Sequence, residues 1–242
     1  NTACHFGMER ELGSITPGRR ADFIVTSSIN DFPIDAVFAR GEHVAENGKL
    51  LSRCPHYEWP QSVRETVNLG KKLERKDFVI SVPAGLSLVK AKVIGVIENQ
   101  APTKALEFDL PVEQGEVQLV ADVCHLSLVE RHRGTGAVVN GFVSGFGYTG
   151  SMAIASSVAH DSHHMIVVGT NQEMMASAAN RLGELGGGVS LWKDGTEVAR
   201  VELPIAGLMS DSKASEVAVK AQAIVSAMID CGCTLNNAYM QH

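Results

Sequence analysis

The chain has 242 residues, of which 45% are hydrophobic and 20% charged, a composition typical of a folded globular protein with one or two domains. Its net charge of −6 and scattered basic residues argue against nucleic-acid binding, which needs a basic face, and no segment indicates a membrane or disorder. The cysteines are odd in number and form no C-x-x-C motif, which favours a reducing, cytoplasmic protein over a disulfide framework.

The first seven residues (NTACHFG) are typical of the middle of a helix that leads directly into residues 8–13 (MERELG). This end of the sequence carries no initiator methionine and no signal peptide. We therefore expect the chain to be a fragment of a longer polypeptide. This expectation bears on function, because active-site groups can then lie outside the sequence.

Short strands and turns are expected over residues 11–53. Pro17 and Gly18 suit the two central positions of a type II turn, because proline fixes φ and glycine accepts positive φ. The expected elements are strands over 21–26, 36–39 and 43–45 and a turn at Asn47-Gly48. Residues 51–61 have no clean periodicity and are expected to form a linker.

From residue 78 onward the pattern predicts an α+β domain, because stretches rich in β-branched residues are separated by turn glycines. Strands are expected over 78–82, 89–98, 105–110, 117–121, 126–130, 138–143, 165–169, 189–192 and 196–201. Two further stretches have apolar residues at helical spacing. They predict a helix over 171–185, ended by the glycines 186–188, and a helix over 212–229 with Ser210 or Asp211 as its N-cap.

The densest group of ionisable residues lies in two stretches, 129–147 (VERHRGTGAVVNGFVSGFG) and 158–169 (VAHDSHHMIVVG), which hold four of the nine histidines. A polar cluster set between apolar strands is where ligand contact or chemistry usually occurs. The candidate substrate-side residues are His160, Asp161 and His163 in one short loop, together with Glu130 and His132, which could meet that loop across a sheet.

Three roles are open for the loop around His160. It can face a substrate or another domain, with a histidine donating a hydrogen bond; it can bind a metal; or its side chains can cap a strand and satisfy buried backbone groups. His160 and Asp161 point to opposite faces of an extended segment, so the group converges only if the chain turns. For the charged run 130–133, an ion-pair network is favoured over catalysis.

Other motifs have simpler explanations. Residues 141–150 (GFVSGFGYTG) lack the strand-to-helix setting of a phosphate loop, so tight turns are expected there. Cys231 and Cys233 are expected to be buried thiols at a helix end, since two thiols without a second pair are a weak metal signal.

Two parts of the sequence resemble a known superfamily. Residues 11–26 (ELGSITPGRRADFIVT) and the hairpin over 37–50 resemble the segment with which amidohydrolases leave their (β/α)8 barrel and return to a small β-sandwich. Residues 129–147, 158–171 and 203–210 (LPIAGLMS) resemble the C-terminal domain of microbial adenine deaminases, and this second likeness extends over most of 75–230.

The resemblance implies an α+β fold, in which a β-sandwich remnant precedes a mixed-sheet α+β domain and the barrel lies outside the chain. The domains expected are residues 1–60, the end of a barrel helix and the sandwich strands; residues 61–77, a linker; and residues 78–242, the C-terminal domain. The returning strands should then lack partners, so residues 11–50 are expected to expose sheet edges and apolar surface.

The resemblance also implies hydrolytic deamination of adenine to hypoxanthine and ammonia by a metal-activated hydroxide. The chain has no H-x-H motif, so the binuclear Mn or Fe ligands are expected upstream, and no residue here is assigned as catalytic or metal-binding. The implied partners are adenine, the upstream barrel and further copies of the chain, without nucleic acid or membrane. A non-catalytic binding or assembly module, or an amidohydrolase with another substrate, is the alternative.

Overall fold

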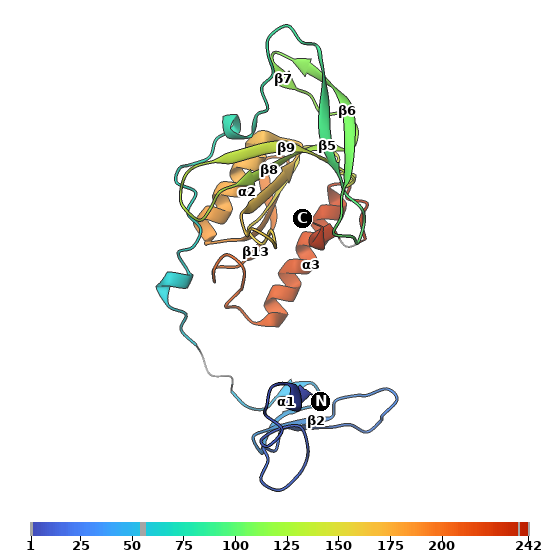
Figure 1. Cartoon of the computed structure of the whole chain (residues 1–242), viewed down its shortest axis with the longest axis vertical. Coiled ribbons are helices and arrows are strands. Elements are labelled where there is room, and N and C mark those ends of the chain that lie inside the picture. The colour runs from blue at the N-terminus through green and yellow to red at the C-terminus, as the bar shows by residue number, and fades with distance from the viewer. Residues whose placement is uncertain (1, 54–56, 237, 242) are drawn as a thin grey trace. The chain divides into compact units, whose positions relative to one another are not determined.

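The computed structural model describes residues 2–53, 57–236 and 238–241. The chain forms two compact units, residues 1–58 (unit 1) and 59–242 (unit 2), which are described separately (Figure 1). Within the described residues, no helix has both the length and the apolar character needed to cross a bilayer. Cys54 and part of the linker expected over 51–61 lie outside the described residues.

Unit 1 is a small antiparallel sheet with the strand order β1-β2-β3-β4. Its elements are α1 (Thr2–His5), β1 (Phe23–Val25), β2 (Ala36–Ala39), β3 (Glu42–Glu46) and β4 (Lys49–Leu50). The turn predicted at Asn47-Gly48 joins β3 to β4, and both residues have positive φ, 47° and 75°. Such angles match the twist of a tight hairpin, which explains the asparagine and glycine there.

Unit 1 has no core of its own. None of its described residues is buried, and Ile15 and Ile29 are 85% and 89% exposed. Phe32 and Ile34 in the β1–β2 connection are also exposed. The expectation that residues 11–50 leave apolar surface uncovered is therefore confirmed, and a sheet of this kind needs a further layer to bury its side chains.

Unit 2 is built on a mixed nine-stranded sheet with the order β13-β12-β10-β11-β8-β9-β5-β6-β7, so the α+β class is confirmed. All neighbours are antiparallel except β5 and β9, which are parallel. The strands are β5 (Leu88–Gly95), β6 (Lys104–Glu113), β7 (Glu116–Val117), β8 (Val123–Val129), β9 (Val138–Ser144), β10 (Met152–Ser156), β11 (Met165–Gly169), β12 (Gly188–Lys193) and β13 (Thr196–Glu202). The helical elements are η1 (Gln61–Val63), η2 (Arg75–Phe78), α2 (Gln172–Leu185), α3 (Ala214–Asp230) and η3 (Ala238–Met240).

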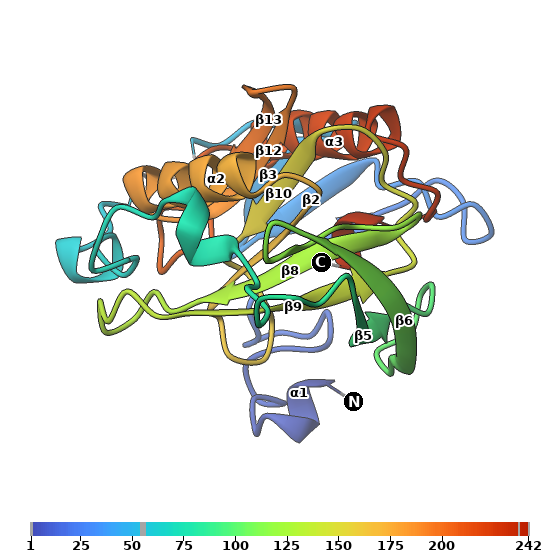
Figure 2. The same cartoon turned by 90° about the horizontal axis from the view of Figure 1, so that it is seen from above.

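The two long helices bury opposite faces of the sheet. Ala153 and Ala155 of β10 belong to the buried cluster that contains the apolar side chains of α2. Met152 and Ile154 of the same strand belong to the cluster that contains Ile224 and Met228 of α3. Figure 2 shows β10, β12 and β13 between the two helices. Strand β10 is thus buried on both faces, by α2 on one side and α3 on the other.

Both helices end and begin largely as their sequences predict. The side chain of Asn171 accepts a hydrogen bond from the backbone N–H of Met174 at the start of α2, and Gly186 ends this helix with φ of 76°. The predicted N-cap of α3 is wrong. The helix begins after Lys213, whose side chain makes no capping bond.

Two expected strands differ from the structure, and one observed strand was not expected. Residues 78–82 form no named strand; the 3-10 turn η2 ends at Phe78, and only Ser81 makes an isolated bridge. Residues 117–121 contribute only the end of β7. Strand β10 was not predicted, because the first four residues of its sequence MAIAS are all apolar and show no alternation.

The segment expected as a linker over 61–77 is partly buried. Leu69 and Leu73 belong to the apolar cluster around α2. The side-chain amide of Asn180 on α2 accepts from the backbone N–H of Leu73 and donates to its carbonyl oxygen, both at 2.9 Å. This part of the segment is therefore held against the helix.

We expect Gly188→Ala to destabilise unit 2 strongly. A Cβ atom at Gly188, where φ is 139°, would lie 2.0 Å from the carbonyl oxygen of Val201. The overlap and the backbone strain should together lower the free energy of unfolding by about 3 kcal/mol or more. Gly195→Ala is the matched control, because Gly195 has φ of 84° but no neighbour within 4 Å. This substitution should lower the free energy of unfolding by about 1–2 kcal/mol. If urea denaturation gave the same loss for both variants, the close approach at Gly188 would be contradicted.

Candidate functional site

The candidate site centres on the segment 157–164 between β10 and β11, here named the His160 loop. The backbone N–H of His163 donates to the carbonyl oxygen of Ala159 at 2.8 Å, and φ is positive at both residues, 23° and 52°. The loop is therefore a tight turn and not an extended segment. This turn is the condition under which its side chains can gather on one side.

A buried arginine holds the backbone of this loop. The Arg131 side chain is 1% exposed, and its Nε donates to the carbonyl oxygen of His163 at 2.5 Å. Its Nη2 donates to the carbonyl oxygens of Ser157 and Ala206, both at 3.3 Å, and Nη1 lies 3.5 Å from that of Thr66. No carboxylate of the described residues forms an ion pair with it, and burial lowers its pKa. Arg131 thus connects three segments through carbonyl groups alone.

Glu130 organises the turn that follows β8. Its carboxylate accepts hydrogen bonds from the backbone N–H groups of His132, Arg133 and Thr135 at 2.5, 2.8 and 3.0 Å. Burial raises the pKa of Glu130, but these backbone hydrogen bonds outweigh it and bring the pKa to about 2. The ion-pair network expected over 130–133 is therefore wrong for Glu130 and Arg131, because backbone groups satisfy both.

Two of the candidate histidines also support the loop. Nε2 of His132 lies 3.2 Å from the carbonyl oxygen of Ser162, and its ring lies 4.8 Å from that of His164. Nδ1 of His163 lies 2.6 Å from the carbonyl oxygen of Val158. Each of these nitrogens must carry a proton to bond a carbonyl oxygen. His132 does meet the loop across the sheet, and the contacts of both side chains are structural.

His160 and Asp161 are placed differently from the other candidates. Their side chains are 83% and 95% exposed, and His160 Nε2 lies 3.5 Å from Asp161 Oδ1, a distance that gives an ion pair when the imidazole is protonated. Neither side chain is used to hold the fold. They are the two members of the candidate group that are free to contact another molecule.

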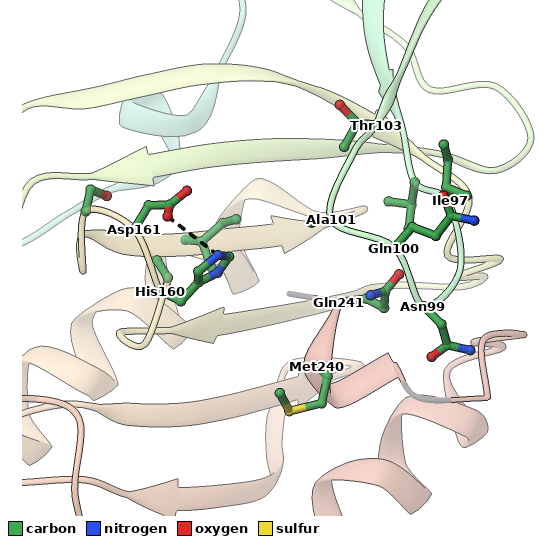
Figure 3. A pocket seen from close by; sticks show the side chains of 13 residues that line it. Ile97, Asn99, Gln100, Ala101, Thr103, His160, Asp161, Met240 and Gln241 are labelled. Carbon is green, nitrogen blue, oxygen red and sulfur yellow. Dashed lines mark ion pairs between the residues drawn. The ribbon is translucent and has the colours of Figure 1, made fainter. Parts of the chain in front are cut away.

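Both residues line a cavity of about 550 Å³ between the His160 loop, the β5–β6 connection and η3 (Figure 3). Its polar lining includes Asn99, Gln100 and Gln241, whose amide groups lie across the cavity from Asp161. A second, apolar cavity of about 310 Å³ is lined by Ile154, Val158, Val189 and Tyr239. His160 and Met240 line both cavities, so the two adjoin.

Several of these residues carried no signal in the sequence. Asn99 and Gln100 belong to a short connection that has no motif, and Met240 lies near the end of the chain. Asn99 and Gln100 approach His160 through the pairing of strands far apart in the sequence, and Met240 approaches it on η3, which follows α3. The sequence shows Arg131 only as part of the charged run 130–133, because burial of an arginine cannot be read from its neighbours in sequence.

The glycine-rich loop and the cysteines are structural, as expected. The carboxylate of Asp122 accepts hydrogen bonds from the backbone N–H groups of Gly145 and Gly147 at 2.9 and 2.7 Å, so these donors are not available for a phosphate. Cys231 and Cys233 are buried, and burial raises the pKa of both thiols. Within the described residues, no three His, Cys, Asp or Glu side chains gather as a metal site.

Both units of the chain are similar to known proteins. The sequence model of the adenine deaminase C-terminal domain matches residues 100–242. The chain belongs to the adenine deaminase C-terminal domain family. It is 66% identical, over its whole length, to an adenine deaminase of Ruegeria pomeroyi, and 65% identical to one of Roseobacter denitrificans. An adenine deaminase of Moorella thermoacetica is 41% identical over 99% of the chain.

This family membership confirms the resemblance found in the sequence. The chain spans about 40% of the length of these relatives, 41% for Ruegeria pomeroyi and 40% for the other two. The match of the domain begins at residue 100, whereas the similarity to the relatives also covers unit 1. The His160 loop and the apolar cavity lie within the residues that match the adenine deaminase C-terminal domain. The larger cavity is lined in addition by Val96, Ile97 and Asn99, which precede the match.

We expect Arg131→Ala to lower the free energy of unfolding by about 3–5 kcal/mol, because four carbonyl groups lose a buried donor. Arg133→Ala is the matched control. Its side chain is exposed and two residues away, so its loss should change stability by less than about 0.5 kcal/mol. Chemical denaturation of both variants measures the difference, and similar losses would contradict the clamping role of Arg131.

The lowered pKa of Glu130 predicts a pH-dependent contribution to stability. The ionised carboxylate stabilises the fold above its unfolded-state pKa, about 4.3, and this contribution is lost as the pH falls toward about 2. The deficit of Glu130→Gln relative to the unsubstituted chain should therefore be largest above about pH 5 and shrink in acid.

Urea denaturation between pH 3 and 7 tests this expectation. Glu113→Gln serves as the control, because the Glu113 side chain is exposed and its replacement should change stability by less than about 0.5 kcal/mol at every pH. A deficit of Glu130→Gln that stays constant or grows in acid would show that the backbone hydrogen bonds do not depend on the charge.

Proposed function

We propose that the chain is the C-terminal part of an enzyme that hydrolyses adenine to hypoxanthine and ammonia. The observation that carries this proposal is the 66% identity over the whole chain to a protein named adenine deaminase. Water replaces the amino group at C6 of adenine, and the amino group leaves as ammonia. The name of the relatives supports the substrate, and the membership of this chain in the domain family supports its transfer here.

The metal chemistry of such an enzyme does not fit the described residues of this chain. They contain no group of three metal-ligating side chains, and the sequence contains no H-x-H motif. We propose that the Mn or Fe centre belongs to the part of the relatives that precedes the matched segment. The complete polypeptide is proposed to be a cytoplasmic homo-oligomer.

We further propose that the two units serve the complete enzyme in different ways. Unit 1 has no buried residue among those described, so the upstream polypeptide is proposed to cover its apolar side chains. Unit 2 has its own core and offers His160 and Asp161 on a loop whose backbone is fixed by Arg131. The fixed backbone gives both side chains a defined starting position, and their exposure leaves them able to contact a substrate.

The exposed apolar surface of unit 1 also supports a second candidate function, a non-catalytic assembly module. In that case the chain would bind its partner through unit 1 and make no contact with substrate. The two functions differ in what the His160 loop does. Replacement of His160 would alter turnover in the first case and leave it unchanged in the second.

We expect the 242-residue chain alone, with Mn or Fe added, to form no hypoxanthine, while the polypeptide extended to the full length of its relatives deaminates adenine. In the extended enzyme, His160→Asn should lower kcat/KM by about 100-fold, the usual value of a positioned proton donor or acceptor. Its thermal unfolding should be unchanged, since the side chain is exposed.

His163→Asn and Glu107→Gln are the controls for this experiment. His163→Asn removes the bond to the Val158 carbonyl and should lower the free energy of unfolding by about 1–3 kcal/mol. Glu107→Gln changes an exposed carboxylate on β6 and should alter neither kcat/KM nor thermal unfolding. Hypoxanthine production by the chain alone, or unchanged turnover in His160→Asn, would contradict the proposal.

A further inference from the structure

The two adjoining cavities of unit 2 combine an apolar wall with a polar rim. The wall is formed by Ile154, Val158, Val189 and the ring of Tyr239. The rim carries the amides of Asn99, Gln100 and Gln241 on one side and Asp161 on the other (Figure 3). Three segments that are distant in sequence meet here, which is typical of a ligand pocket formed by the fold itself.

The size of the apolar cavity suits a small ring system. Its volume of about 310 Å³ lies at the lower end of the range seen for ligand pockets, roughly 300–1,000 Å³. Branched aliphatic side chains and an aromatic ring form flat apolar contacts with the faces of a heterocycle. The edge of such a ring would then reach the polar rim through His160, which lines both cavities.

The charge of the rim restricts the ligand further. Of the described residues that line the two cavities, none is lysine or arginine, and Asp161 supplies a carboxylate. A phosphate group would meet this carboxylate without a lysine or arginine to compensate the two negative charges, which disfavours nucleotides. Amide groups offer donors and acceptors side by side, and the carboxylate accepts N–H groups. The lining therefore fits an uncharged or protonated nitrogen heterocycle.

We propose that these cavities bind a free purine base, with its faces against the apolar wall and an N–H group donated to the carboxylate of Asp161. The geometry supplies the class of ligand, a compact nitrogen heterocycle without phosphate. The choice of a purine within that class rests on the proposed function. Unit 2 thus recognises the base through its own residues and excludes the phosphorylated forms.

Isothermal titration of the 242-residue chain with adenine, and separately with adenosine monophosphate, tests this inference. Adenine should bind with one site per chain and at least tenfold more tightly than the monophosphate. Asp161→Asn should weaken adenine binding at least tenfold. Asp109→Asn, which changes an exposed carboxylate on β6, should bind adenine as the unsubstituted chain does.

A second variant keeps the test independent of charge. Met240 is 69% exposed and lines both cavities, so Met240→Trp should fill the space without disturbing the core. It should abolish adenine binding while leaving thermal unfolding unchanged. Absence of adenine binding at 1 mM, equal binding of the monophosphate, or unchanged binding by both Asp161→Asn and Met240→Trp would overturn the inference.

The outcome is separable from that of the proposed function. If the extended polypeptide deaminates adenine but the chain binds no purine, the purine site alone is refuted. If the chain binds adenine as described but the extended polypeptide does not deaminate it, the enzymatic proposal alone is refuted.

Discussion

The guanidinium group of Arg131 is the constraint on which the candidate site depends. A buried cation is costly unless hydrogen bonds replace its hydration, and here carbonyl oxygens do so without any carboxylate from the described residues. Because the acceptors are backbone groups of the His160 loop, the turn at Ala206 and the segment at Thr66, these segments cannot move apart without leaving the charge unsatisfied. The buried guanidinium therefore holds these three segments together.

This restraint separates the roles of neighbouring residues. Glu130, His132 and His163 each bond backbone groups of the loop or of the turn before it, so these side chains support the backbone. His160 and Asp161 are carried on that fixed backbone with their side chains exposed. A short run of similar ionisable residues thus contains both supporting groups and groups able to meet a substrate, which only the three-dimensional contacts distinguish.

Much of unit 2 could be predicted from the sequence, because its helices have clear apolar periodicity and its turns carry glycine. Strand β10 could not, since a short segment buried on both faces shows no alternation. Residues 61–77 lack periodicity although Leu69 and Leu73 are in the core. At the site, His160 and Asp161 were predicted from the density of ionisable groups. Asn99, Gln100 and Met240 carry no such signal, because only the tertiary arrangement of the β5–β6 connection and η3 brings them to His160.

The central claim is that one buried guanidinium fixes the His160 loop and the segments beside it as a unit. Hydrogen–deuterium exchange of Arg131→Lys tests this most directly, because lysine keeps the charge but cannot reach several carbonyl groups at once. We predict faster exchange, in the folded state, of amides over residues 63–68, 157–164 and 205–209 together, with β12 and β13 unchanged. Unchanged exchange in these segments, or acceleration in only one of them, would contradict the claim.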